Sequence, residues 1–318
     1  FCLRRSQPNG KLKICFILFL FLILYLSIQF VYPHFFKHHE VLIEKNQYTP
    51  IHFNDLTLKM RVLKFPANFQ RNCNMDKHGL NIFVQSNPSN KQARASIRST
   101  WANATNSKAI RDRTARFFFV VGNGNLSLFD LKDEISTYDD IIVIDFLDNY
   151  YNLVYKTSFT LAIYNEFCSS SFMVKVDEDV VFHVDRLLNY TQQVASPEQS
   201  LIHCGVVRNR PPIRAQNSHW YISNYEFNEP TFPPYCLGPF YVISRKAAMR
   251  MYKATSNFNI VHIEDVFFTG IVARFLKINF TEQQHLYLHM LRSKSKCSPQ
   301  LTAIHSVKNL SAMKNTWT

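Results

Sequence analysis

The chain has 318 residues, of which 47% are hydrophobic, and it carries a formal net charge of +13. This length and hydrophobic content fit one large domain or two small ones with a substantial core. The chain has only 7 glycines and neither G-x-G-x-x-G nor G-x-x-x-x-G-K-[ST], which excludes a glycine-rich phosphate cradle. Its lysines and arginines are scattered and accompany no nucleic-acid-binding motif, so we expect a generally basic surface and no nucleic-acid partner.

Residues 14–32 form an uninterrupted apolar segment without a charged side chain. As a helix, this segment would extend about 28 Å at ~1.5 Å per residue, close to the thickness of the hydrocarbon layer of a bilayer. Arg4, Arg5, Lys11 and Lys13 precede it, and such positive charge keeps an N-terminus on the cytoplasmic side. The pattern predicts a cytoplasmic tail over residues 1–13, a transmembrane signal anchor over 14–32 and a single-pass type II protein, with a cleaved signal peptide as the alternative.

Cysteines and glycosylation sequons agree with a lumenal location for the rest of the chain. Once Cys2 and Cys15 are set aside, five cysteines remain, enough for two disulfides and one free thiol, and their spacing leaves the pairing open. Five N-x-[ST] sequons follow the apolar segment and predict N-glycosylation. Their asparagines are Asn103, Asn125, Asn189, Asn279 and Asn309.

Strands and helices alternate through the middle of the chain, after a polar segment over residues 33–76 that is typical of a stem. The domain that begins at residue 77 is expected to open with a strand over 80–85 and a turn over 86–89 that ends in a good helix N-cap. The helix that follows carries Arg94, Ile97, Arg98 and Trp101 on one face. Further strands are predicted over 117–121 and 140–146, and helices over 126–135 and 152–167. This alternation predicts an α/β fold with a mostly parallel central sheet flanked by helices.

Three consecutive acids interrupt an apolar, β-rich run over residues 171–182. Asp177, Glu178 and Asp179 would lie at the carboxyl end of a buried strand, where ligands bind in sheets of this kind. Asp145 and Asp148 follow another strand, so two acidic loops could converge on one crevice. Carboxylates in such a place suit a hard divalent cation, Mn²⁺ or Mg²⁺, which can also hold a diphosphate. A surface turn with solvated acids is the alternative.

The second half of the chain is less regular. We expect a strand over 201–207, a loop-rich segment over 208–234, a turn-dense stretch over 233–239 and a strand over 240–244. A helix is predicted over 245–253, and another opens over 263–270 with Glu264 and Asp265 in its first turn, where acids often only complement the helix dipole. A strand-like segment around 303–305 and a short helix ending near Trp317 follow.

Five separated blocks of the sequence carry a resemblance to a known family. Residues 94–101 are similar to R-x-x-I-R-x-T-W, residues 138–157 to Y-x-D-I-I…D-F…D-x-Y-x-N-L-T-x-K-T, and residues 175–179 to K-x-D-D-D. Residues 234–241 resemble P-x-Y-x-x-G-x-x-Y, and residues 264–266 resemble E-D-V. In this order the blocks are those of the β1,3-glycosyltransferase family, the galactosyltransferase group related to the fringe proteins. Glu178 replaces the commoner Asp, Val154 replaces a Thr, and Gly270 lies one residue later after E-D-V than in many members.

The resemblance implies a GT-A type fold for a single lumenal domain over residues 77–318. It implies inverting transfer of a hexose from a UDP-sugar to the 3-hydroxyl of a glycan on a glycoprotein or glycolipid, with galactose favoured and an N-acetylhexosamine as the alternative. Mn²⁺, or Mg²⁺ in its place, is the implied cofactor, and the Golgi membrane is the implied location. The rival functions are a non-catalytic lectin or folding partner, and a metal-dependent phosphotransferase or nucleotidyltransferase.

The same resemblance implies roles for individual residues. Asp265 is the expected general base, with Glu264 as its alternative or partner in acceptor binding. Asp179, Asp177 and His305 are the expected metal ligands. The donor would contact Arg94, Arg98, Asp148, Lys156, Asp177 and Glu178. Three aromatic residues could stack on sugar rings or could equally belong to the core: Trp220, Tyr235 and Tyr241.

Overall fold

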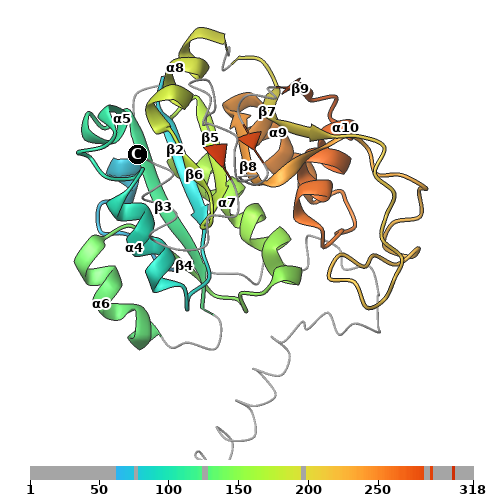
Figure 1. Cartoon of the computed structure of the whole chain (residues 1–318), viewed down its shortest axis with the longest axis horizontal. Coiled ribbons are helices and arrows are strands. Elements are labelled where there is room, and N and C mark those ends of the chain that lie inside the picture. The colour runs from blue at the N-terminus through green and yellow to red at the C-terminus, as the bar shows by residue number, and fades with distance from the viewer. Residues whose placement is uncertain are drawn as a thin grey trace, which may run out of the picture. The chain divides into compact units, whose positions relative to one another are not determined.

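A mixed eight-stranded sheet forms the centre of the molecule (Figure 1). The computed structural model describes residues 62–74, 78–123, 128–194, 198–282, 287–288 and 303–304, all within the compact unit Tyr48–Thr318. The strand order is β1-β4-β3-β2-β5-β8-β7-β9. The strands are β1 (Val62–Lys64), β2 (Leu80–Gln85), β3 (Ala115–Gly122), β4 (Ile141–Ile144), β5 (Phe172–Asp177), β7 (Leu201–Val207), β8 (Tyr235–Ser244) and β9 (Asn279–Glu282).

The sheet has a parallel half and a largely antiparallel half. β4, β3, β2 and β5 are parallel neighbours, whereas β8 runs antiparallel to both β5 and β7, and β1 runs antiparallel to β4. Four of the seven described strand pairs in this sheet are parallel, so the prediction of a mostly parallel sheet holds for its central strands, and the pairing becomes antiparallel at β8. The reason is the connection from β7 to β8, which is a loop without a crossover helix and so permits antiparallel pairing.

The parallel register brings the carboxyl ends of the central strands together. Gln85 at the end of β2 lies opposite both Asp177 at the end of β5 and Val120 of β3. β2 is buried along its whole length and β5 is buried up to Asp177, so the chain leaves the core at these ends. Residues that follow β2 and β5 are therefore neighbours in space although they are about 90 positions apart in sequence.

Helices cover both faces of the sheet and enclose two apolar cores. Side chains alternate between the faces: in β8, Tyr241 and Ile243 belong to one core and Phe240 and Val242 to the other. The first core is closed by α3 (Phe69–Cys73), α7 (Leu153–Phe167), α9 (Arg245–Thr255) and the π-helical η2 (Val266–Val272), which continues into α10 (Ala273–Phe275). The second is closed by α4 (Lys91–Ser99), α5 (Lys108–Arg111), α6 (Leu128–Tyr138) and α8 (Val184–Val194).

A second, three-stranded sheet lies beside the acidic segment. It has the order β10-β11-β6, formed by β10 (Tyr287–Leu288), β11 (Ala303–Ile304) and β6 (Val181–Phe182). Ile304 pairs with Val181, two residues after Asp179. The short β11 therefore packs next to the turn that carries the three acids.

Two disulfides cross-link the described part of the chain, in agreement with the predicted number. Cys73–Cys168 joins the end of α3 to the end of α7, and Cys204–Cys236 joins β7 to β8. Cys297 lies outside the described residues. The pairing, which the sequence left open, follows from which strands and helices are neighbours.

Several predicted boundaries differ from the structure. β8 begins at Tyr235, within the stretch expected to be a turn, and α8 was not predicted. α4 begins after Asn90 instead of Ser89, and the Asn90 side chain does not cap the helix because it binds Glu178. Among the described residues, no helix is both long and apolar enough to cross a membrane, and the predicted anchor over 14–32 lies outside them.

Candidate active site

The acidic turn after β5 is held in place by a buried tryptophan. All three acids are partly buried: Asp177 ends β5, and Glu178 and Asp179 lie between β5 and β6. The Trp101 indole donates to the Val180 carbonyl oxygen at 3.1 Å, and its ring packs against Phe182 with centroids 4.5 Å apart. A residue of the first sequence block thus fixes the backbone immediately after the acids.

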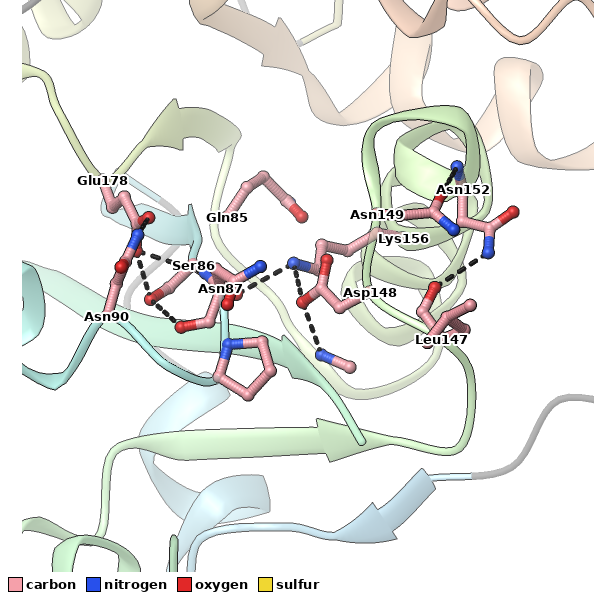
Figure 2. Close-up of polar contacts among 12 residues, drawn as sticks. Gln85, Ser86, Asn87, Asn90, Leu147, Asp148, Asn149, Asn152, Lys156 and Glu178 are labelled. Carbon is pink, nitrogen blue, oxygen red and sulfur yellow. Dashed lines mark hydrogen bonds and ion pairs between the residues drawn. The ribbon is translucent and has the colours of Figure 1, made fainter. Parts of the chain in front are cut away.

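The middle acid, Glu178, binds the loop after β2 (Figure 2). Its carboxylate accepts from the Ser86 hydroxyl at 2.5 Å, from the Asn87 backbone N–H at 3.2 Å and from the Asn90 side-chain amide. Burial raises the pKa of Glu178, and these hydrogen bonds oppose the rise. The oxygens of Glu178 thus organise the loop that lines the pocket, and its contact with the donor stays a prediction.

Arg94 and Arg98 lie behind this loop, not in the pocket. Arg94 is fully buried and forms a bidentate pair with Glu134, and its remaining N–H groups bind Ser86, Asn87 and Pro88. These contacts use all five N–H groups of the guanidinium. Arg98 pairs with Glu134 and Asp140. Neither arginine lines the pocket, so the structure does not form the predicted donor clamp: Arg94 holds the loop by hydrogen bonds, and Arg98 is engaged in its two ion pairs.

Asp148 and Lys156 form a second buried pair on the opposite side of the loop (Figure 2). Lys156 Nζ donates to Asp148 Oδ2 at 2.6 Å and to the Ser86 carbonyl oxygen at 2.9 Å. The same Asp148 oxygen accepts from the Gly122 backbone N–H at 2.9 Å. Burial lowers the pKa of Lys156, and the adjacent Asp148 partly offsets this. The end of β3, the turn after β4 and the loop after β2 are therefore joined around one lysine.

These groups surround a pocket of about 670 Å³, named here the β2/β5 pocket. Of the residues with a predicted role, Asp148, Lys156 and the three acids 177–179 line it. The remaining lining is mostly small and polar. It comprises Gln85, Ser86, Asn87, Ser89, Asn90, Gln92, Ala93, Ser96, Asn149, Tyr150 and Leu153.

Glu264, which is buried, and Asp265, which is partly buried, form an acidic pair at the start of η2. The Tyr241 hydroxyl donates to Glu264, and Asp265 accepts from the backbone N–H of Gly238 at 3.0 Å and of Val266 at 2.8 Å. Burial and then the charge of Glu264 raise the pKa of Asp265 to about 7. Burial also raises the pKa of Glu264. Asp265 therefore has the proton affinity expected of a general base near neutral pH.

Lys175 connects the two acidic groups. Its Nζ donates to Asp177 Oδ1 at 2.6 Å and to the Gly238 carbonyl oxygen at 2.7 Å, and it lies 3.6 Å from Glu264 Oε2. The side chain is fully buried. Burial lowers its pKa, but Asp177 and Glu264 together raise it above the ordinary value. Lys175 belongs to the K-x-D-D-D block, but the sequence alone assigned it no role. Its contact with Glu264 arises only because β5 pairs with β8.

A second pocket, of about 430 Å³ and named here the β8/η2 pocket, contains the acidic pair. Trp220 and Tyr235 line it, and their stacking on a sugar ring stays a prediction. Burial and the charge of Asp265 raise the pKa of Tyr235 to about 12. Tyr241 is fully buried and does not line the pocket, so its predicted stacking role is replaced by its hydrogen bond to Glu264. The lining also includes Arg210, Phe232, His262 and Ile263.

The two pockets adjoin one another. Tyr150, Leu153 and Asp177 line both of them. Tyr150 is close enough to the acidic pair for Asp265 and Glu264, after burial, to raise its pKa. An elongated ligand could therefore extend from the loop after β2, past Asp177, to Asp265.

The acidic turn fits a divalent cation shared with a ligand. Asp177 and Asp179 both face the β2/β5 pocket, and Lys175 occupies one oxygen of Asp177. Mg²⁺-like ions are commonly held by one or two carboxylates together with substrate phosphates. No cluster of three or more His, Cys, Asp and Glu side chains suited to a metal occurs in the described part of the chain. His305, the third predicted ligand, lies outside that part.

Three of the five sequons fall within the described residues. Asn189 on α8 and Asn279 on β9 are exposed, and Asn103 is half-buried in a turn where it accepts from Thr105. Asn125 and Asn309 lie outside the described residues. Glycosylation at all five positions stays a prediction.

Together, the mixed α/β sheet and the two adjoining acidic pockets form a candidate active site. The galactosyltransferase family profile matches residues 92–284. The chain therefore belongs to the galactosyltransferase family.

Named relatives agree with this assignment. The chain is 34% identical over 239 residues to the Caenorhabditis elegans β-1,3-galactosyltransferase bre-2, covering 71% of this chain and 66% of that protein. It is 31% identical over 232 residues to the human lactosylceramide 1,3-N-acetyl-β-D-glucosaminyltransferase, and this match covers 70% of this chain and 61% of the human protein. The chain thus spans somewhat less than two thirds of the length of these relatives. The solved structure of mouse xyloside xylosyltransferase 1 matches 71% of this chain and 96% of its own at 10% identity and a TM-score of 0.36, too distant to support an argument.

Proposed function

We propose that the chain is an inverting β1,3-hexosyltransferase that uses a UDP-hexose donor, with galactose favoured and N-acetylhexosamine as the alternative. The observation that carries the proposal is the continuity of the two pockets through Asp177. One pocket has the acids and polar loops suited to a nucleotide diphosphate, and the other has a carboxylate suited to deprotonate a hydroxyl. Family membership supports the same chemistry.

In the proposed reaction, Asp265 accepts the proton of the acceptor 3-hydroxyl while that oxygen bonds to the anomeric carbon. The bond from this carbon to the phosphate oxygen breaks on the opposite face, UDP leaves with the electron pair, and the configuration inverts. Asp177 and Asp179 would hold a Mn²⁺ ion, or Mg²⁺ in its place, which when bound stabilises negative charge on the departing diphosphate. Lys156 and the loop after β2 would position the nucleotide.

The names of the relatives suggest the acceptor class and cellular setting. One relative is named for N-acetylglucosamine transfer to lactosylceramide and another for β-1,3-galactose transfer. We accordingly propose a glycan on a glycolipid or glycoprotein as acceptor and a GT-A type catalytic domain. The apolar segment 14–32, the sequons and the two disulfides support a type II location in the Golgi membrane with the catalytic domain in the lumen.

UDP release from the purified full-length chain tests the proposal. UDP-galactose, UDP-N-acetylglucosamine and UDP-N-acetylgalactosamine are compared with lactose and lactosylceramide as acceptors, with Mn²⁺ or with excess chelator. We expect turnover with one donor, dependence on the cation and a β1,3 linkage in the product. Asp265→Asn should lower kcat by roughly 10²- to 10⁴-fold, as expected for loss of a general base.

Glu229→Gln is a suitable control because Glu229 is exposed, pairs only with Arg274 among the contacts described and lies outside both pockets. It should retain full activity. Cation-dependent UDP binding without transfer to any acceptor would instead support a non-catalytic lectin or folding partner. Full turnover by both Asp179→Ala and Asp265→Asn would contradict the assigned roles.

A further inference from the structure

A buried histidine next to the acidic pair is held by a carboxylate from the loop-rich segment. His262 Nδ1 lies 2.6 Å from Glu226 Oε1, and the His262 backbone N–H donates to the same oxygen at 2.8 Å. His262 is only 2% exposed, and the Glu226 side chain is 8% exposed. Two hydrogen bonds to one oxygen fix both the backbone and the ring plane of His262.

This arrangement leaves the other ring nitrogen without a protein partner. His262 Nε2 is buried and makes no hydrogen bond to any residue of the described structure. Buried polar atoms in native proteins normally have a hydrogen-bond partner, because a buried polar atom without one destabilises the folded state. A histidine can be left unpaired in this way when its partner is a ligand.

The position of His262 indicates where such a ligand would lie. His262 lines the β8/η2 pocket together with Glu264 and Asp265, whereas Glu226 does not line it. The carboxylate thus holds the ring from outside the pocket. Because the two nitrogens of an imidazole point in diverging directions, Nδ1 toward Glu226 turns Nε2 away from Glu226. The ring of Tyr151 packs against the imidazole with centroids 5.2 Å apart.

Resting on the proposed function, we infer that His262 Nε2 binds a hydroxyl of the hexose that occupies the β8/η2 pocket, with Glu226 as its positioning residue. An ionised carboxylate only accepts hydrogen bonds, so the N–H of a neutral His262 is on Nδ1 and its Nε2 is an acceptor. A sugar hydroxyl donates to such a nitrogen, whereas an ether or methylene in its place cannot. The pair therefore selects a hexose with a hydroxyl at one position.

The test compares His262→Leu with His203→Leu in the full-length chain. His203 is a matched control because it is fully buried, has Nδ1 3.3 Å from the Tyr190 hydroxyl, leaves Nε2 without a partner in the described structure and lines neither pocket. Each variant is assayed with the preferred UDP-hexose and lactose, with monodeoxy analogues of the donor hexose, and with monodeoxy lactosides. UDP affinity and melting temperature are measured in parallel.

We expect one monodeoxy analogue to lower kcat/KM of the wild type by roughly 10- to 100-fold, the effect of one hydrogen bond between buried groups. In His262→Leu the parent sugar should show the same loss, and the analogue should fall no further. His262→Gln should recover part of the loss, Glu226→Gln should weaken the preference, and UDP affinity should be unchanged. If the analogue that loses activity in the wild type but loses no more in His262→Leu is a donor analogue, the hydroxyl belongs to the donor hexose. If it is a lactoside, the hydroxyl belongs to the acceptor.

Two outcomes overturn the inference alone. In the first, the wild type transfers hexose, but every monodeoxy analogue lowers kcat/KM relative to the parent sugar by the same factor in His262→Leu as in the wild type. In the second, His203→Leu reproduces the loss of His262→Leu with the same analogue profile. A wild-type protein inactive with all donors would overturn the proposed function, and the inference with it.

Discussion

At the scale of single residues, the chemistry depends on carboxylates whose environments differ sharply. Asp265 is buried beside Glu264, which favours its protonated form, yet two backbone N–H groups favour its charged form. Glu178 is partly buried, and its carboxylate accepts hydrogen bonds from Ser86 and Asn90 of one loop. Neighbouring groups therefore decide which acid is available to a substrate.

The raised pKa of Asp265 predicts a pH dependence. A base acts only when deprotonated, so kcat/KM of the wild type should fall as pH decreases through about 7, the value to which burial and Glu264 raise the pKa of Asp265. Replacing Glu264 by Gln removes a neighbouring negative charge, lowers the pKa of Asp265 and should move the acid limb of the profile to lower pH. Profiles of kcat/KM against pH check both statements; an acid limb that stays in place in Glu264→Gln would show that another group is titrating.

Glu178 should act on donor binding through the loop after β2. Glu178→Asp shortens the side chain by one methylene and loses contacts with Ser86 and Asn90. We expect the donor KM to rise about 10- to 100-fold, from the loss of hydrogen bonds to a charged group, with little change in kcat. Initial-rate kinetics over donor concentration measure this. Glu166→Asp, at an exposed position on α7, is the control and should match the wild type.

At the scale of elements, two glycines allow strands to approach the functional carboxylates. A Cβ atom on Gly238 of β8 would lie 2.9 Å from Asp265 Oδ2, and one on Gly122 of β3 would lie 2.8 Å from Asp148 Cβ. Both distances are too short for ordinary contact, so a side chain at either position must displace its carboxylate. The two sites lie on different pockets.

This geometry predicts opposite kinetic signatures for two alanine variants. Gly238→Ala should displace Asp265 and lower kcat by at least roughly 10-fold with UDP affinity unchanged, because a small misplacement of a catalytic group has a large effect. Gly122→Ala should displace Asp148 and Lys156, raising the donor KM and weakening UDP binding. Steady-state kinetics and UDP titration calorimetry distinguish the two, and each variant is the control for the other. Identical effects on both quantities would contradict the assignment of the pockets.

The element that carries Asp265 is itself irregular. η2 is a π-helix, and such wider turns are frequent at functional sites. Gly270 within η2 lies against Pro233 and Tyr235, where a Cβ would come within 3.2 Å. Asp265 is the N-cap of this π-helix, and its carboxylate accepts from the Val266 backbone N–H.

At the scale of the whole molecule, the two disulfides stabilise different parts of the fold. Cys73–Cys168 closes a separation of 95 residues and Cys204–Cys236 one of 32. Cys204–Cys236 also anchors the start of β8, and the Cys236 backbone N–H donates to Thr269 of η2 at 2.8 Å. The second bridge is therefore connected to the β8/η2 pocket and the first is not.

Removing the bridges should separate stability from activity. In the chain-entropy model, Cys73→Ser with Cys168→Ser loses about 4.7 kcal/mol of unfolding free energy, and Cys204→Ser with Cys236→Ser loses about 3.7 kcal/mol. We expect only the second double variant to lose activity under conditions where it remains folded. Guanidinium denaturation and UDP-release assays on the same preparations measure both quantities; a reversed order of stabilities would contradict the entropic account.

Local sequence pattern was sufficient for the elements on which the site is built. The strand that ends in Asp177, the helix after residue 90 and the buried β2 all follow from apolar periodicity, and the structure confirms them. Pattern failed where pairing across the sheet prevailed over local preference. Tyr235 begins a strand despite its proline- and glycine-rich surroundings because it pairs with Val207 of β7.

The sequence by itself determined which residue types could carry the chemistry, because clusters of acids at the ends of predicted strands and helices can be recognised from residue order alone. Only the tertiary structure decided their roles. Arg94 is a buried partner of Glu134, Lys175 joins Asp177 to Glu264, and His262 lies against Glu226. The contacts of Arg94 with Glu134, Lys175 with Glu264 and His262 with Glu226 join residues 36 to 89 positions apart. A charge or hydrogen-bond partner acts through distance in space, which the spacing of residues along the chain does not specify.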